Sequence, residues 1–247
     1  MKFAARTDTG KYRTLNEDSY FVDEEIGLFV IADGVGGHDA GDVASRVAVA
    51  VFEEWADDIH KLPTDSIDTS PPAKLETLKA LVNEANHRVY ERSLTRSFSN
   101  GMGTTLIGGF ITPSNLIYAH VGDSRLYILR GGVLEQTTTD HSLVQKLVDM
   151  GKLTPREARV HRHRNIIERA IGFESSVEFD HEIYPLTSND IVLVCTDGLH
   201  DMIIEDAEIA RIITDASDLD AASLALIDKV LEYGGKDNVT LVLAAPC

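Results

Sequence analysis

The sequence predicts an α+β fold built on antiparallel sheets, and three patterns support this prediction. Short runs rich in β-branched and aromatic residues follow one another through the middle of the chain. Tight turns such as "TPSN" and "GDS" separate these runs. Segments with helical periodicity are segregated from the runs instead of alternating with them. Successive strands joined by tight turns favour antiparallel pairing, whereas strict alternation with helices would favour a parallel sheet.

The individual elements follow from the same patterns. Strands are predicted at 20–32 (a hairpin), 104–111, 115–121, 125–130, 190–195 and 239–245. Helices are predicted at 42–58, 74–94, 141–151, 206–214 and 220–233. Residues 61–74 are rich in Pro, Ser, Thr and Asp and are expected to form a surface loop. Because the patterns on both sides of this loop belong to one scheme, a single domain spanning 1–247 is expected.

The composition excludes several classes of protein. The chain has 247 residues, of which 40 are acidic and 23 are Lys or Arg, so its net charge is -17. A surface this acidic repels nucleic-acid backbones, so general nucleic-acid binding is not expected. The sequence contains no apolar stretch of the ~18 residues that a membrane helix needs. The N-terminus lacks the apolar core of a signal peptide, which predicts a cytoplasmic protein.

The cysteines argue against a disulfide framework and against thiol chemistry. The chain has two, Cys195 inside the apolar run "IVLVC" and Cys247 at the end. Cys195 is expected to be a buried thiol, and a disulfide framework is not expected. A cysteine-based phosphatase needs an arginine soon after its cysteine to bind the phosphate. The residues after Cys195 are "TDGLHD", with no arginine, which disfavours that chemistry.

Aspartates recur at the ends of the predicted strands. Three apolar strands end in an aspartate beside a glycine: Asp33, Asp123 and Asp197. Two further aspartates come just before strands: Asp18 and Asp237. An unpaired carboxylate near the core is costly, and several brought together must take up protons or bind cations. Mg²⁺ and Mn²⁺ prefer such oxygen ligands. Asp-Gly is also a common turn dipeptide, but its recurrence at three strand ends favours a metal site.

Seven motifs in a fixed order carry a resemblance to a known family. They are "GKYRTLNEDSY", "ADGVGGHDAGDVAS", "GMGTTL", "AHVGDSRLYILR", "TDHSLVQKLVDMG", "CTDGLHD" and "GGKDNVTLVLA". The series resembles the metal-dependent protein phosphatases, the type 2C Ser/Thr phosphatases, in their compact bacterial form. The resemblance runs from about residue 3 to residue 245. It implies a four-layer α/β/β/α sandwich of two antiparallel sheets flanked by helices, with a flap subdomain at about 141–171.

The resemblance also implies a binuclear Mn²⁺ or Mg²⁺ centre. In this family pattern Asp33 bridges both ions, and the Gly34 carbonyl binds the first. Asp197 and Asp237 bind the second ion, and Asp18 holds a metal-bound water. The implied reaction is a single-step hydrolysis, in which a water or hydroxide activated by the metals attacks the phosphorus of phosphoserine or phosphothreonine.

Bacterial members of the family often bind a third, weaker ion, and the resemblance extends to its ligands. Asp123 and Asp197 match two of them, and Asp201 is an additional candidate. Arg13 of "GKYR" matches the arginine that grips the substrate phosphate. Its planar guanidinium can bind two oxygens at once, which suits that role. The alternative is an ordinary surface arginine.

His38 is the candidate general acid for the leaving alkoxide. It follows Asp33 by five residues in a glycine-rich loop, and histidine suits acid catalysis near neutral pH. Some family members carry a histidine directly after the Asp-Gly pair, where this chain has Val35. A hydrogen bond that orders the loop and an indirect role behind the metals are the alternatives.

The segment "RVHRHRN", residues 159–165, is a basic island in an acidic chain. The resemblance places it in or near the flap, where its charges could meet phosphate or acidic substrate flanks. A helix end that pairs with local acids is the alternative. The expected partners are phosphorylated proteins, targets of a cognate Ser/Thr kinase. A regulatory module without turnover and a hydrolase of another phosphoester are the competing functions.

Overall fold

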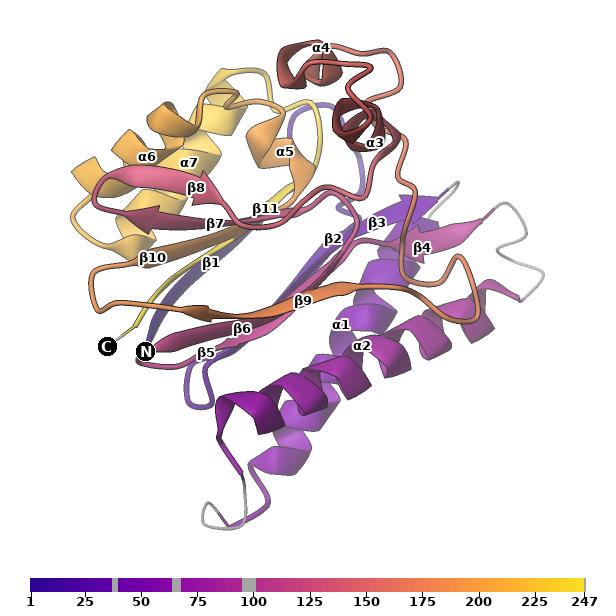
Figure 1. Cartoon of the computed structure of the whole chain (residues 1–247), viewed down its shortest axis with the longest axis vertical. Coiled ribbons are helices and arrows are strands. Elements are labelled where there is room, and N and C mark those ends of the chain that lie inside the picture. Colours follow the sequence, from indigo (N-terminus) through magenta and orange to yellow (C-terminus); the bar gives the residue numbers. More distant parts are fainter. Residues whose placement is uncertain (37–39, 64–67, 95–100, 247) are drawn as a thin grey trace.

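The computed structural model describes residues 1–36, 40–63, 68–94 and 101–246. Two antiparallel sheets pack face to face, and helices cover the outer face of each sheet (Figure 1). This arrangement confirms the predicted α+β sandwich.

The first sheet joins the two ends of the chain. Its strands in spatial order are β1 (Lys2–Asp8), β11 (Val239–Ala245), β10 (Ile191–Cys195), β7 (Arg125–Arg130) and β8 (Val133–Gln136). All neighbours are antiparallel. β1 and β11 pair along their full lengths, so the N-terminus and C-terminus lie close together (Figure 1).

The second sheet carries the first two aspartates of the predicted metal site. Its strands in spatial order are β2 (Asp18–Asp23), β3 (Leu28–Gly36), β5 (Leu106–Ile111), β6 (Asn115–Val121) and β9 (Asp180–Pro185). The short strand β4 (Met102–Thr104) pairs with the end of β3. The predicted hairpin is present, and its register places Asp18 opposite Asp33.

Two pairs of helices cover the sheets. Packed on the second sheet are α1 (Ala40–Ile59) and α2 (Pro71–Ser93). Packed on the first sheet are α6 (Asp206–Asp215) and α7 (Leu219–Glu232). Three shorter helices lie at one end of the sandwich (Figure 1): α3 (Leu143–Asp149), α4 (Pro155–Arg159) and α5 (Asp197–His200).

Each interface between layers has its own hydrophobic core. Phe52 of α1 and Phe110 of β5 are fully buried between helices and second sheet. Phe29 and Val192 lie between the two sheets. Leu226 of α7 packs with residues of the first sheet. Burial of each such large side chain contributes about 1.5–3 kcal/mol to the stability of the fold. The packed sandwich therefore supports the residues at its ends rigidly.

The structure corrects three details of the predicted elements. The run 104–111 is divided into β4 and β5, because the Thr105 backbone N–H turns aside to donate to the Asp33 carbonyl at 2.8 Å. β3 continues past Asp33 to Gly36, so this aspartate does not end its strand. α2 begins at Pro71, within the predicted loop. A proline fits the first helical turn, where its missing N–H would have no intrahelical acceptor.

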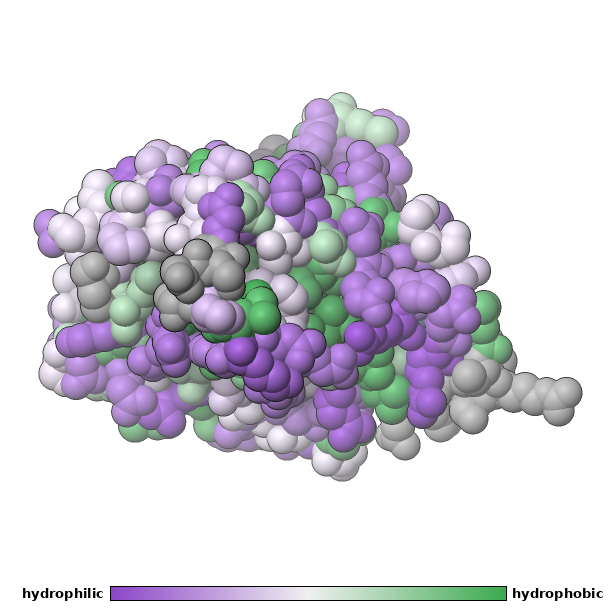
Figure 2. Space-filling model, turned by 90° about the horizontal axis from the view of Figure 1, so that it is seen from below, coloured by the Kyte–Doolittle hydropathy of each residue, from purple (hydrophilic) through white to green (hydrophobic). Residues whose placement is uncertain are grey.

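The outer surface agrees with the composition. Figure 2 shows a face covered mostly by hydrophilic residues, with hydrophobic ones in small separate areas. Within the described part of the chain, no helix combines the length and the apolar character needed to cross a bilayer.

Candidate metal centre

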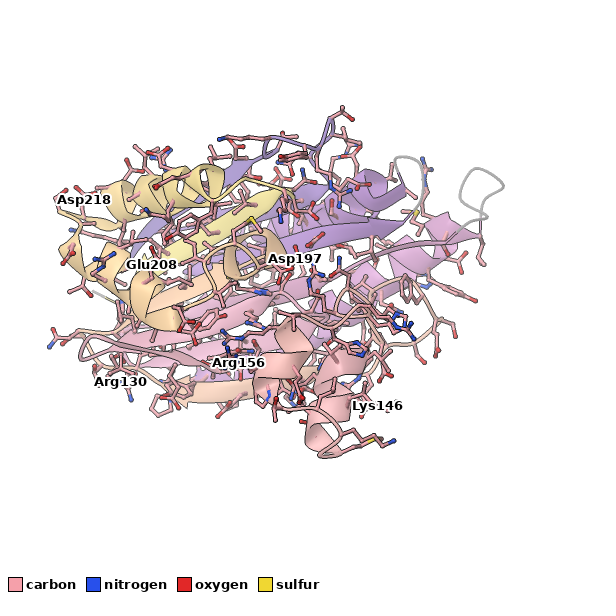
Figure 3. The ribbon with its side chains drawn as sticks, turned by 90° about the horizontal axis from the view of Figure 1, so that it is seen from above. Arg130, Lys146, Arg156, Asp197, Glu208 and Asp218 are labelled. Atoms are coloured by element: carbon pink, nitrogen blue, oxygen red, sulfur yellow. The ribbon has the colours of Figure 1, made fainter. Side chains whose placement is uncertain are left out.

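A polar cleft of about 200 Å³ lies at the end of the sandwich where the predicted aspartates meet. It is lined by Arg13, Glu17, Asp33, Gly34, Val35, Gly36, Asp123, Asn165, Ile167, Asp197, Asp237 and Asn238. In Figure 3 Asp197 lies near the middle of the face that also carries α3 and α4. Four aspartates from four separate segments therefore share one cleft, together with Gly34 and Arg13.

Hydrogen bonds from the β4–β5 junction hold Asp33 in place. Its backbone N–H donates to Thr105 Oγ1 at 3.0 Å. Its carbonyl accepts from the Thr105 N–H at 2.8 Å and from Thr104 Oγ1 at 2.8 Å. Both threonines are buried. The break between the two strands therefore fixes the backbone of the residue that the sequence places at the centre of the site.

Asp197 and Asp123 enter the cleft from the two sheets. Asp197 is the first residue of α5, and Thr196 alone separates it from the end of β10. Asp123 follows β6 and is preceded by Gly122, whose φ of +109° is a conformation that favours glycine. A Cβ at Gly122 would lie 2.6 Å from Thr105 Cγ2. The chain therefore turns sharply against the β4–β5 junction just before Asp123.

Asp18 lies behind the cleft and not on its wall. It is buried, and its Oδ2 accepts a hydrogen bond from Thr196 Oγ1 at 2.9 Å. Its Oδ1 is buried and has no hydrogen-bond partner among the described residues. A buried carboxylate oxygen without a partner is costly unless a proton or a cation satisfies it.

The electrostatics of the cluster favour bound protons or cations. Burial, followed by the neighbouring aspartates, raises the pKa of Asp33 and of Asp197 well above the ordinary range. Burial also raises the pKa of Asp18 and of Asp123 to about 7. Asp33 and Asp197 keep partial exposure toward the cleft, so solvent ions can reach them. Oxygen ligands of this kind suit Mg²⁺ or Mn²⁺, so the residues present fit the predicted cations.

Arg13 lies at the edge of the cluster and pairs with one of its members. Its Nη2 donates to Asp237 Oδ2 at 2.8 Å, and its Nη1 lies 3.9 Å from Glu17 Oε2. The hydrogen bond with Asp237 raises the pKa of Arg13. About half of its side chain remains exposed, so the guanidinium is accessible to a ligand that enters the cleft.

One further predicted residue does not line this cleft, and another falls outside the described residues. Asp201 is outside its lining; its Oδ2 lies 3.6 Å from Arg164 Nε, and its Oδ1 lies 3.7 Å from His200 Nδ1. Burial raises the pKa of Asp201. His38 lies outside the described residues, so its assignment as general acid stays a prediction.

The basic island shows the local pairing that was one of its two interpretations, and its contact with substrate stays a prediction. Arg164 pairs with Asp201, and Arg159 Nη1 donates to the Ile204 carbonyl at 2.7 Å. These contacts match the interpretation as a helix end paired with local groups. Asn165, the last residue of the island, lines the cleft. The island therefore joins α4 to the wall of the site.

Sequence reasoning missed several residues of the cleft, above all Asn238. Its Oδ1 accepts from the Glu17 N–H at 2.9 Å, and its Nδ2 donates to the carbonyls of Thr9 and Leu15 at 2.9 and 3.0 Å. It thus ties the segment before β2 to the segment before β11. Glu17 and Asn238 each stand beside a predicted aspartate, which was the available signal.

Comparison with known proteins identifies the family. The family model for protein phosphatase 2C matches residues 11–229. The chain belongs to the protein phosphatase 2C family. The serine/threonine phosphatase stp of Listeria monocytogenes is 38% identical over 242 residues, which cover 96% of this chain and 93% of the relative. Protein phosphatase PhpP of Streptococcus pneumoniae is 35% identical, covering 99% of this chain and 97% of the relative.

Solved structures of the protein phosphatase 2C family share the fold. The serine/threonine phosphatase PstP/Ppp of Mycobacterium tuberculosis superposes with a TM-score of 0.86 at 35% identity, covering 99% of this chain and 97% of that one. The PstP catalytic domain in complex with two manganese ions gives a TM-score of 0.84 at 35% identity, again covering 99% and 97%. The family, the four-layer sandwich and the class of metal-dependent phosphatase predicted from the sequence are thereby confirmed.

Proposed function

We propose that this chain is a protein serine/threonine phosphatase that uses the aspartate cleft to hydrolyse phosphoserine and phosphothreonine in other proteins. One observation carries the proposal. Four aspartates from separate segments meet in one cleft beside an accessible arginine. The named activity of the relatives, which match the chain over nearly its full length, supports the same reaction.

The residues proposed to hold two divalent cations are Asp33, the Gly34 carbonyl, Asp197 and Asp237. Asp18 acts from behind them, and a third, weaker ion would bind at Asp123 and Asp197, with Asp201 as an additional ligand. Mn²⁺ or Mg²⁺ bound there would supply an activated water and would neutralise charge on the phosphoryl oxygens. The manganese-bound PstP neighbour supports Mn²⁺.

Arg13 is proposed to orient the substrate phosphate. Its guanidinium already pairs with a carboxylate at 2.8 Å, which supports a role in binding an anion at the cleft. A phosphate would offer several oxygens to the same fork of donors. Because Arg13 also pairs with Asp237, it links the phosphate-binding position to the proposed metal ligands. His38 is proposed to protonate the leaving alkoxide.

The physiological setting follows from the same activity. The substrates would be targets of a cognate Ser/Thr kinase, in the cytoplasm and without a role for nucleic acid or membranes. The flap, residues 141–171, is proposed as the part that contacts the protein substrate, because it brings Asn165 and Ile167 to the cleft. The competing functions are a regulatory module without turnover and a hydrolase of another phosphoester.

The experiment compares three substrates at the same Mn²⁺ concentration: a phosphothreonine peptide, an aryl phosphodiester and a small phosphorylated metabolite. The proposal predicts the highest kcat/KM for the peptide. Faster cleavage of the phosphodiester or of the metabolite would assign another substrate class. Folded protein that binds Mn²⁺ but cleaves none of the three would support the regulatory module.

A further inference from the structure

His141 holds both backbone groups of Gly122, the residue directly before Asp123. The His141 backbone N–H donates to the Gly122 carbonyl at 2.8 Å. The Gly122 N–H donates to His141 Nδ1 at 3.2 Å. His141 is 6% exposed, so these bonds are shielded from water. This peptide turns at a φ of +109° just before the cleft, and His141 fixes it at two points.

The second ring nitrogen of His141 faces the carboxylate of Asp180, which favours a proton on Nε2, and the guanidinium of Arg169. Because Nδ1 accepts a hydrogen bond, the neutral ring carries its proton on Nε2. Nε2 lies 3.3 Å from Asp180 Oδ2, which can accept this proton's hydrogen bond. Arg169 Nη1 lies 3.4 Å from Asp180 Oδ1 and 3.3 Å from His141 Nε2. Asp180, at the start of β9, thereby keeps Nδ1 free to accept from Gly122.

The same histidine connects Gly122 to the flap. The His141 carbonyl accepts from the Glu168 N–H at 2.7 Å. The Leu143 N–H, two residues on, donates to the Ile166 carbonyl at 2.9 Å. The segment held in this way includes Ile167, which lines the aspartate cleft. His141 therefore joins the loop before Asp123 to the segment 166–168, which leads back from α4.

The cluster around His141 has the composition of a metal site, but its contacts argue against one. Ligand atoms of His120, His141 and Asp180 all lie within 4.8 Å of one another. However, the tautomer fixed by Gly122 leaves His141 Nε2 protonated, without a lone pair for a cation. The guanidinium of Arg169 at 3.3 Å also repels one. His120 stacks on the His141 ring, with centroids 4.6 Å apart.

We propose that His141 is a positioning residue, which through Gly122 sets the carboxylate of Asp123 for cation binding. Asp180 supports it by holding the tautomer that accepts from Gly122. This inference rests on the proposed function of the cleft. Residues that orient metal ligands from behind commonly affect metal affinity by about 10–100-fold when they are replaced, and such an effect is expected here.

Two substitutions at His141 distinguish the contribution of Nδ1 from that of Nε2. In His141→Asn the amide oxygen lies near the position of Nδ1 and can still accept from Gly122. In His141→Gln the amide reaches toward the position of Nε2 and the bond to Gly122 is lost. Tyr118→Phe is the matched control, because Tyr118 lines the same pocket as His120 and Asp180, and among the described residues its hydroxyl bonds only Glu182, at 3.0 Å.

The experiment is a calorimetric titration of the chelator-treated, dialysed protein with Mn²⁺, read alongside melting temperature. Asp123→Asn identifies the binding step that depends on Asp123. His141→Gln and Asp180→Asn are expected to weaken that step about 10-fold or more, His141→Asn by less than ~3-fold, and Tyr118→Phe not at all. The double variant His141→Gln/Asp123→Asn should bind no more weakly than Asp123→Asn alone, since both act on one ligand.

Three results would overturn the inference. His141→Gln could leave every Mn²⁺-binding step unchanged while lowering the melting temperature, which is the result of a purely structural role. The losses of the double variant could be additive. His120→Asn could remove a whole equivalent of Mn²⁺, which would make the imidazoles ligands. Phosphate release by the wild-type protein is measured separately, so absent turnover would refute the proposed function without deciding the role of His141.

Discussion

Replacing Asp18 with asparagine is expected to stabilise the metal-free protein at alkaline pH. Asp18 is buried, with one oxygen bonded to Thr196 and the other without a hydrogen-bond partner in the described part of the chain. Burial raises the pKa of Asp18 from 3.8 to about 7. Asparagine has nearly the same shape, keeps an acceptor for Thr196, and carries no charge at any pH.

The size of the effect follows from the two pKa values. A group whose pKa is raised in the folded state holds its proton more tightly there than in the unfolded chain. At ~1.4 kcal/mol per pKa unit, the rise from 3.8 to about 7 costs wild type up to about 4 kcal/mol once the carboxylate is ionised. The cost is absent below pH ~3.8, accumulates between pH ~4 and ~7, and is complete above pH ~7.

The assay is urea unfolding of wild type and Asp18→Asn with chelator at pH 4, 6 and 8. The variant should match wild type at pH 4 and exceed its free energy of unfolding by up to about 4 kcal/mol at pH 8. Saturating Mn²⁺ should reduce the difference, because cations favour the ionised carboxylate. Asp228→Asn, at an exposed position of α7, is the control. An equal difference at pH 4 and pH 8, or a less stable variant at pH 8, would refute the reasoning.

Two further substitutions test other parts of the site. Arg13→Ala removes the guanidinium that pairs with Asp237 and should raise KM for a phosphothreonine peptide about 10-fold; Arg13→Lys should recover part of the loss, and an unchanged KM in both would remove Arg13 from phosphate binding. Gly122 has a φ of +109°, and a Cβ added there would lie only 2.6 Å from Thr105 Cγ2. Gly122→Ala should therefore lower the free energy of unfolding by about 1–3 kcal/mol. Gly132→Ala, at a φ of +82° with no atom within 4 Å of the Cβ, should cost less in urea unfolding, and equal losses would show that the contact with Thr105 is unimportant.

The sequence predicted the elements whose apolar residues form a clear helical or strand pattern within the element itself. All six predicted strand regions and all five predicted helices are present; the first region is the predicted hairpin, and the second region is divided. The prediction missed β1, β8 and β9, which all lie at sheet edges. β9 reads "DHEIYP", and all of its residues are exposed or half-buried. Its strand character comes from pairing with β6, which no local pattern reveals. The short helices α4 and α5 have too few residues to display a helical period.

The sequence predicted those residues of the candidate site that can be recognised from their own type and their immediate neighbours in the chain. Asp33, Asp197 and Asp237 were found because each stands at the end or the start of a predicted strand, and the structure brings all three into one cleft. The functions of Asn238 and His141 depend on contacts across 221 and 19 residues of sequence, respectively. Such contacts arise only when the sheets pack, so a single sequence gives no local signal for them.

The most direct test of the account is phosphate release from a phosphothreonine peptide by wild type and Asp237→Asn, each with Mn²⁺, with Mg²⁺ and with chelator. We expect metal-dependent release by wild type, loss of release with chelator, and a rate at least ~10²-fold lower in Asp237→Asn, because the substitution removes a charged ligand. Well-folded wild type that releases no phosphate with either cation, or an Asp237→Asn variant as active as wild type, would contradict the account.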